Sequence, residues 1–133
     1  MTEKTQVLLV GKGREPRLKE ILEQRASVAE AGNVPEMVRR LEDATYDAVL
    51  CERELGEETW REALQELQSR RVSTPAIVVS QTSTADEGIE EWTEVLRAGA
   101  FDLLLAPSQE YSVVTMLEHA VESGRARALR KAG

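Results

Sequence analysis

The sequence predicts an α/β protein: a three-layer α/β/α sandwich built on a five-stranded parallel sheet. Five short apolar runs alternate with longer segments of helical period, and this alternation indicates βαβ units with right-handed crossovers. Two of the central runs are apolar at consecutive positions, as in strands that are covered on both faces. A helical bundle is excluded, because runs of four or five residues are too short to be its helices.

The first strand is predicted at residues 7–10, where four apolar residues precede the Gly11-Lys12-Gly13 turn. Pro16 suits the first turn of the following helix, because its missing N–H would be unpaired there. The second run, residues 27–31, is half polar. It therefore predicts a strand nearer the edge of the sheet.

The second helix is expected to begin after Asn33, whose side chain can cap it, with Glu36 three residues further on as in a capping box. The third strand is expected at residues 48–51. Glu57 and Glu58 follow it, where a helix N-terminus favours negative charge. The apolar face of the third helix is expected at Trp60, Leu64 and Leu67.

The second half of the chain supplies the last two strands and two helices. The fourth strand is expected at residues 76–79, and a long helix then ends at Gly99, a natural helix C-cap. The fifth strand is expected at residues 101–105, before a last amphipathic helix. In the fourth helix one side is apolar, with Ile89, Trp92 and Leu96. Another side is acidic and is interpreted either as a solvated face or as a docking face, with Asp86, Glu87, Glu90, Glu91 and Glu94.

Length, charge and cysteine content limit the class of protein. A chain of 133 residues is one domain's worth, and its net charge of −7 argues against nucleic-acid binding through this domain. No apolar run is long enough to span a membrane, and no signal peptide is recognised, so we expect a cytoplasmic protein. One cysteine and one histidine cannot form an internal disulfide or a His/Cys zinc site.

The C-terminus differs in charge from the rest of the chain. Residues 124–133 carry four basic and no acidic residues, which leaves −11 on residues 1–123. We expect one domain over residues 1–123. Residues 124–133 are interpreted either as a basic tail that contacts nucleic acid or an acidic partner, or as a continuation of the last helix that starts a linker to a further domain.

Four stretches carry a family resemblance, in the family's order and spacing. They are YDAVLCE at residues 46–52, TPAIVVS at 74–80, LRAGAFD at 96–102 and LLLAP at 103–107. Together they resemble the receiver domain of bacterial two-component response regulators, over about residues 5–122. The resemblance implies a flavodoxin-like fold with strand order 2-1-3-4-5 and a site at the carboxyl ends of the strands.

The resemblance also places the family's metal and phosphoacceptor positions. The two acidic residues that hold Mg²⁺ in the family correspond to Gly11 and Lys12, and the phosphorylated aspartate corresponds to Glu52. Mg²⁺ usually needs one or two carboxylates, so one ligand set is missing. Glu52 is interpreted either as a mimic of the phosphorylated state or as a solvated or paired polar residue. We predict a direct ion pair between Lys12 and Glu52 in place of the metal contact.

The remaining family positions are Ser80, Leu103 and Ala106. Ser80 keeps the hydroxyl that contacts the phosphoryl group, and without that group we expect it to hydrogen-bond locally at the strand end. Leu103 stands at the aromatic switch position and is expected to pack in the core. Ala106 replaces the lysine that pairs with phosphate. Cys51 is expected to be a small core residue.

These residues indicate a signalling module of a two-component system that lacks the usual phosphorylation chemistry. We expect no enzyme activity, no cofactor and no resident metal. The resemblance implies a protein partner (a sensor kinase, an output domain or a second copy) at the fourth helix, fifth strand and fifth helix. Two alternatives stay open: a conventional phosphoacceptor that uses Glu52, and a ligand-binding protein on a flavodoxin-like scaffold. The second needs a phosphate-binding loop or a flavin pocket, and the sequence shows neither.

Overall fold

The computed structural model describes residues 4–55, 57–81, 85–106 and 109–132, and they form the predicted three-layer sandwich. Its central sheet has five parallel strands in the order β2-β1-β3-β6-β7. β6 and β7 are the fourth and fifth strands of this sheet, so the predicted order 2-1-3-4-5 is confirmed. The strands are β1 (Thr5–Val10), β2 (Ala26–Ala31), β3 (Ala48–Glu52), β6 (Ala76–Gln81) and β7 (Asp102–Ala106).

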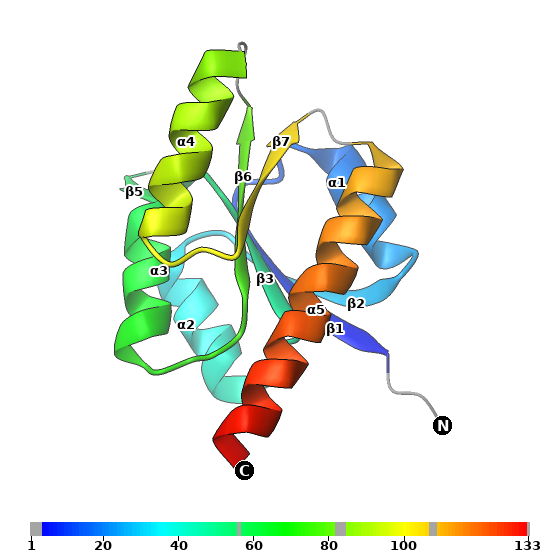
Figure 1. The fold of residues 1–133 in the computed structure, drawn as a ribbon, viewed down its shortest axis with the longest axis vertical. Coiled ribbons are helices and arrows are strands. Elements are labelled where there is room, and N and C mark those ends of the chain that lie inside the picture. The colour runs from blue at the N-terminus through cyan, green and yellow to red at the C-terminus, as the bar shows by residue number, and fades with distance from the viewer. Residues whose placement is uncertain (1–3, 56, 82–84, 107–108, 133) are drawn as a thin grey trace.

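Five helices cover the two faces of the sheet. They are α1 (Pro16–Glu23), α2 (Val34–Asp43), α3 (Trp60–Ser69), α4 (Ala85–Arg97) and α5 (Glu110–Ala132). α1 and α5 lie on one face, and α2, α3 and α4 lie on the other (Figure 1). Two apolar clusters result, one under each helical layer. All five residues of β3 are buried, which agrees with its apolar residues at consecutive positions.

The predicted cap of α2 is present. The side chain of Asn33 accepts a hydrogen bond from the amide of Glu36 at 2.9 Å. The carboxylate of Glu36 accepts from the amide of Gly32 at 2.6 Å, one residue earlier than in a regular capping box. The first bond satisfies a backbone donor that the first turn of a helix leaves unpaired, and the second ties the residue before the N-cap to that turn.

The start of α3 differs from the prediction. A short antiparallel hairpin, β4 (Glu54–Leu55) with β5 (Glu58–Thr59), comes before the helix, so Glu58 lies in a strand rather than at the helix N-terminus. Thr59 is the N-cap. Its amide and hydroxyl donate to the Glu62 carboxylate at 2.8 Å and 2.7 Å, which completes a capping box. The helix begins at the residue type that can satisfy its free amides, and not at the acidic pair.

The apolar side of α4 lies outside the core. Ile89 is 63% exposed and Trp92 is 48% exposed, whereas Val95 is buried. Trp92 is connected to the sheet by a hydrogen bond: its indole N–H donates to the Asp102 carboxylate of β7 at 2.9 Å. Of the three residues that share a side in the sequence pattern, Ile89 and Trp92 are therefore largely exposed, whereas Leu96 is half-buried.

α5 continues past the expected boundary at residue 124 without a break. A Cβ at Gly124 would lie 3.0 Å from the Pro75 ring, so this part of the helix still packs against the domain. The side chains of residues 127–132 are outside the described set. Among the described residues no helix combines the length and apolar character that a membrane crossing needs.

The capping box of α3 predicts a pH-dependent stability difference. Hydrogen bonds from the Thr59 hydroxyl and amide hold the pKa of Glu62 below its ordinary value. A lowered pKa adds stability that is complete at neutral pH and is lost as the pH falls below about 4. Glu62→Gln keeps an acceptor but does not titrate.

We expect the variant to melt about 2–4 °C below the wild type at pH 7. The difference should shrink as the pH is lowered through the reduced pKa of Glu62, as measured by thermal melts followed by circular dichroism at pH 7 and at an acidic pH. A difference that stays the same at both pH values would contradict this role of the carboxylate.

Candidate functional site

The carboxyl ends of β1, β3 and β6 meet at one edge of the sheet. A pocket of about 210 Å³ opens there. Edges of this kind are where ligands bind in open parallel sheets. The pocket is lined by Arg14, Glu15, Glu52, Arg53, Glu54, Val79 and Gln81.

Glu52 is the last residue of β3, and its carboxylate is held by the turn that follows β1. Its Oε1 accepts a hydrogen bond from the amide of Lys12 at 2.6 Å, and its Oε2 accepts from the amide of Arg14 at 2.9 Å. The residue is only 8% exposed. Each carboxylate oxygen therefore has a charge-assisted hydrogen bond that offsets the loss of water.

Gly11 leaves the space that this carboxylate occupies. A Cβ at position 11 would overlap the carboxyl group of Glu52. Gly11 also has φ +150°, a conformation that residues with a side chain rarely adopt. Glycine at position 11 and glutamate at position 52 therefore fit each other sterically.

The predicted ion pair between Lys12 and Glu52 is wrong. Lys12 reaches Glu52 through its backbone amide, and its ammonium group lies near Gly32, 3.8 Å from where a Cβ of Gly32 would stand. No ion pair joins the two described side chains. The physical reason is proximity: the amides of a tight turn point at the carboxylate, whereas a long exposed side chain leads away from it.

Two of the other expected site residues are buried, and they differ in how they fit. Ser80 is 1% exposed, but its hydroxyl has no hydrogen-bond partner in the described part of the chain, so the expected local hydrogen bond is wrong. Leu103 packs in the cluster beneath α2, α3 and α4, as expected. The backbone of Ala106 lies opposite Gln81 at the end of β7, and Pro107 lies outside the described residues.

Cys51 is a core residue, as expected, and is buried among apolar side chains. Burial, with a smaller contribution from the negative charge of Glu52, raises the pKa of its thiol to about 12. A thiol with so high a pKa stays protonated near neutral pH, and the thiolate is the nucleophilic form. Cys51 is therefore a packing residue at this edge.

Sequence reasoning missed two arginines at the pocket. Arg14 contributes its backbone amide to Glu52, and its guanidinium pairs with Glu54 at 3.3 Å. Arg53 pairs with Glu91 of α4 at 2.9 Å. A backbone donor gives no signal in a sequence. The partner of Arg53 was visible only as one of several acidic residues in the fourth helix.

This fold and edge can be compared with known proteins. The family model of the response regulator receiver domain matches residues 15–118. The chain belongs to this family. The transcriptional regulatory protein ZraR of Klebsiella oxytoca is 29% identical to the receiver domain over 80 residues, which is 60% of this chain and 17% of that protein. The match therefore spans a small part of the relative's length.

Solved structures show the same fold at low sequence identity. NtrX from Brucella abortus superimposes with a TM-score of 0.83 at 17% identity, over 98% of this receiver domain and 29% of that chain. The beryllofluoride-activated NtrC4 receiver domain dimer gives a TM-score of 0.75 at 16% identity, over 90% of this chain and 98% of that chain. At such identities the likeness establishes the fold.

The residues at this edge do not fit the Mg²⁺ ion that the family implies. Mg²⁺ takes oxygen ligands in near-octahedral geometry, usually including one or two carboxylates. Both oxygens of Glu52 accept from backbone amides, and Gly11 and Lys12 have no carboxylate. Across the described ranges, no group of three or more His, Cys, Asp or Glu residues is placed to hold a metal.

The fit between Gly11 and Glu52 predicts unequal effects of alanine at the two glycines of the turn. Gly13 has φ +73° and open space around its missing Cβ, so Gly13→Ala costs only backbone strain, about 1–2 kcal/mol. Gly11→Ala adds the overlap with Glu52, and we expect a total loss of about 2–5 kcal/mol.

Urea denaturation measures both losses. In the background of Glu52→Ala, the extra cost of alanine at position 11 should fall, because the overlapping group is gone. Equal losses for the two glycine variants would contradict the steric fit.

Proposed function

We propose that this receiver domain signals through protein–protein contact and does not accept a phosphoryl group at Glu52. It acts as a binding module of a two-component system, not as an enzyme, and we place it in the cytoplasm. The observation that carries the proposal is the state of the Glu52 carboxylate. It is buried, and the amides of Lys12 and Arg14 bind one oxygen each.

Three physical arguments support this proposal. Each oxygen of Glu52 accepts an amide hydrogen bond, which stabilises the carboxylate and lowers its nucleophilicity. Phosphoryl transfer also depends on positioning and charge neutralisation, and the Mg²⁺ ligands of the family are absent at Gly11 and Lys12. Ala106 stands where the family has the lysine that pairs with phosphate. Ser80 alone keeps the family's residue type.

The first test is intact-mass spectrometry after incubation with Mg²⁺ and a small acyl-phosphate donor. We expect no added phosphoryl group, because Glu52 is held by the turn, while an ordinary receiver domain treated in parallel gains one. Gain of one phosphoryl mass that disappears in Glu52→Gln would overturn the proposal and restore a conventional phosphoacceptor.

The contact surface that we propose is formed by α4, β7 and α5. The large exposed apolar side chains among the described residues all belong to these three elements. They are Ile89, Trp92, Leu105 and Tyr111, here called the partner face. α4 and α5 lie on opposite faces of the sheet, on either side of the edge strand β7 (Figure 1). Apolar side chains gathered in this way are typical of a protein interaction site.

We propose a second copy of this chain as the partner at this face. A two-fold interface needs a self-complementary patch, and an apolar patch beside an edge strand meets that need. The NtrC4 receiver domain, which has the same fold, is described as a dimer. Sensor kinases and output domains are the other partners of the family. Because α5 continues to Ala132, we also propose that residues 124–133 lead toward an output domain.

Sedimentation velocity tests the second copy. We expect concentration-dependent dimerisation of the wild type, weakened about tenfold or more in Ile89→Asp because a charge would then be buried at the interface. Gln65→Asp, at an exposed position of α3, is the matched control and should dimerise normally. A wild type that stays monomeric at hundreds of micromolar, or a dimer that is unaffected by Ile89→Asp, would contradict this partner.

A further inference from the structure

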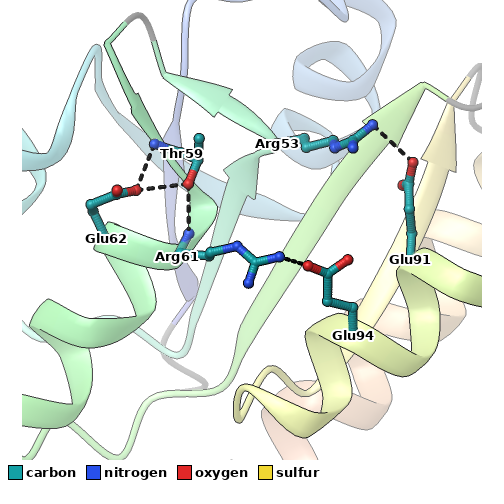
Figure 2. A network of polar contacts seen from close by, with 6 residues as sticks. All are labelled: Arg53, Thr59, Arg61, Glu62, Glu91 and Glu94. Atoms are coloured by element: carbon teal, nitrogen blue, oxygen red, sulfur yellow. Dashed lines mark hydrogen bonds and ion pairs between the residues drawn. The ribbon is translucent and has the colours of Figure 1, made fainter.

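Two ion pairs join α4 to the segment that runs from the end of β3 into α3. Arg53 pairs with Glu91 at 2.9 Å, and Arg61 pairs with Glu94. Glu91 and Glu94 are three residues apart and therefore share a side of α4. Figure 2 shows both carboxylates reaching toward the two arginines. These two pairs are here called the α4 latch.

α4 has little apolar packing of its own. Among its described side chains, Val95 is the large apolar group that is fully buried, and Gly88 beside it has no side chain. Ile89 and Trp92 face outward. A helix usually owes its position to a broad buried stripe, so polar contacts must supply much of what holds α4. On the β7 side this contact is the bond from Trp92 to Asp102, and on the α3 side it is the latch.

The pair between Arg53 and Glu91 is more than a surface contact. The side chain of Glu91 is only 13% exposed. Its Oε1 is bound by Arg53, and its Oε2 is buried without a hydrogen-bond partner among the described residues. Removing Arg53 would leave a buried carboxylate with no compensating charge, which destabilises far more than loss of an exposed pair.

The second arginine is held in place before it meets its partner. The amide of Arg61 donates to the Thr59 hydroxyl at 3.3 Å within the capping box of α3. Its guanidinium lies 4.6 Å from the centroid of the Trp60 ring, within the range of a cation–π contact. An arginine fixed at both ends loses less conformational freedom when it binds Glu94.

Arg53 is also the residue next to Glu52. Glu52 fixes the turn after β1 through two amides, and the amide of Arg53 donates to the carbonyl of Val79 in β6 at 2.9 Å. Two consecutive residues therefore connect the turn after β1, the end of β6 and α4.

We propose that Arg53 and Arg61 are positioning residues whose ion pairs hold the α3 side of α4, and with it the partner face, in one orientation. The latch itself is a property of the isolated domain. The further statement, that the latch presents Ile89 and Trp92 to a partner, rests on the proposed function. The conformation of α4 then depends on ionic strength and on contacts to these four side chains.

Hydrogen exchange measured by mass spectrometry, on the isolated chain without partner or phosphodonor, tests the latch. In Arg53→Gln or Glu91→Gln, we expect amides of residues 87–97 to exchange roughly three to ten times faster, with α1 and α2 unchanged. The double variant should be no faster than the single ones, because the two side chains act as one pair. Arg53→Lys should recover part of the protection.

The control removes an exposed ion pair elsewhere, whose exposure is similar to that of Arg61 and Glu94. Lys19→Gln breaks the pair with Glu30 at 3.2 Å between α1 and β2 and should leave α4 unchanged. If Arg53→Gln does not fold, Glu94→Gln tests the same helix from the second pair, where the carboxylate is exposed. In the wild type, raising NaCl from 0.05 to about 1 M should speed exchange in α4 because salt screens the pairs, and Glu91→Gln/Glu94→Gln should lack this response.

Three results would overturn the proposal. They are unchanged exchange of α4 in the single variants, additive effects in the double variant, and loss of protection over the whole domain, which would mean general destabilisation. The proposed function fails separately, through a phosphorylated Glu52 or an absent partner. Exchange on the isolated chain depends on neither.

Discussion

The carboxylate of Glu52 is the group on which the geometry of this edge depends. A buried carboxylate is costly unless each oxygen is hydrogen-bonded, and here the amides of Lys12 and Arg14 meet that need. The same two bonds fix the turn between β1 and α1. The turn can come this close only because Gly11 has no side chain to oppose the carboxyl group. The carboxylate of Glu52 therefore requires a glycine 41 positions earlier in the chain.

The neighbouring residue, Arg53, connects the same edge to the helical layer on the other face of the sheet. Arg53 follows Glu52 in the chain and pairs with Glu91. The two residues therefore contact the turn that leads into α1 and also α4. A phosphoryl group would bring about −1.5 to −2 charges to such an edge. In this domain the single charge of Glu52 is already satisfied by backbone donors. The two arginines that line the pocket, Arg14 and Arg53, are paired with Glu54 and Glu91.

The sheet could be predicted from the sequence because its signal is local and repeated. The apolar runs of β3 and β6 have nearly every residue buried, and the family resemblance then gave the strand order. The contacts of Glu52 could not be predicted in the same way. Side-chain types suggested a lysine partner, whereas the true donors are backbone amides whose direction depends on the turn.

The orientation of α4 could not be predicted either. The spacing of Ile89, Trp92 and Leu96 identified a shared side of the helix, but it did not show that the smaller residues Gly88 and Val95 are the buried ones. That choice is made by tertiary contacts, above all those of Glu91 and Trp92.

A helix held chiefly by charged and polar contacts responds to binding differently from one held by a large apolar stripe. A ligand can shift a conformational equilibrium only by the difference in its affinity for the two states. Ile89 borders the same surface hollow as Arg61 and Glu94, whereas Trp92 is hydrogen-bonded to β7. A partner that meets Trp92 on the β7 side of α4 does not compete with Arg53 for Glu91. Such a partner would bind the latched helix as it stands, and the latch would lower the entropy lost on binding.

A partner that binds Glu91 or Glu94 would instead release the helix. The two modes differ in salt dependence, since the first buries apolar surface and the second exchanges one set of ion pairs for another. The arrangement of α4 therefore favours a partner that binds a preformed apolar surface. This is the mode of binding that we propose for this receiver domain, without dependence on phosphate.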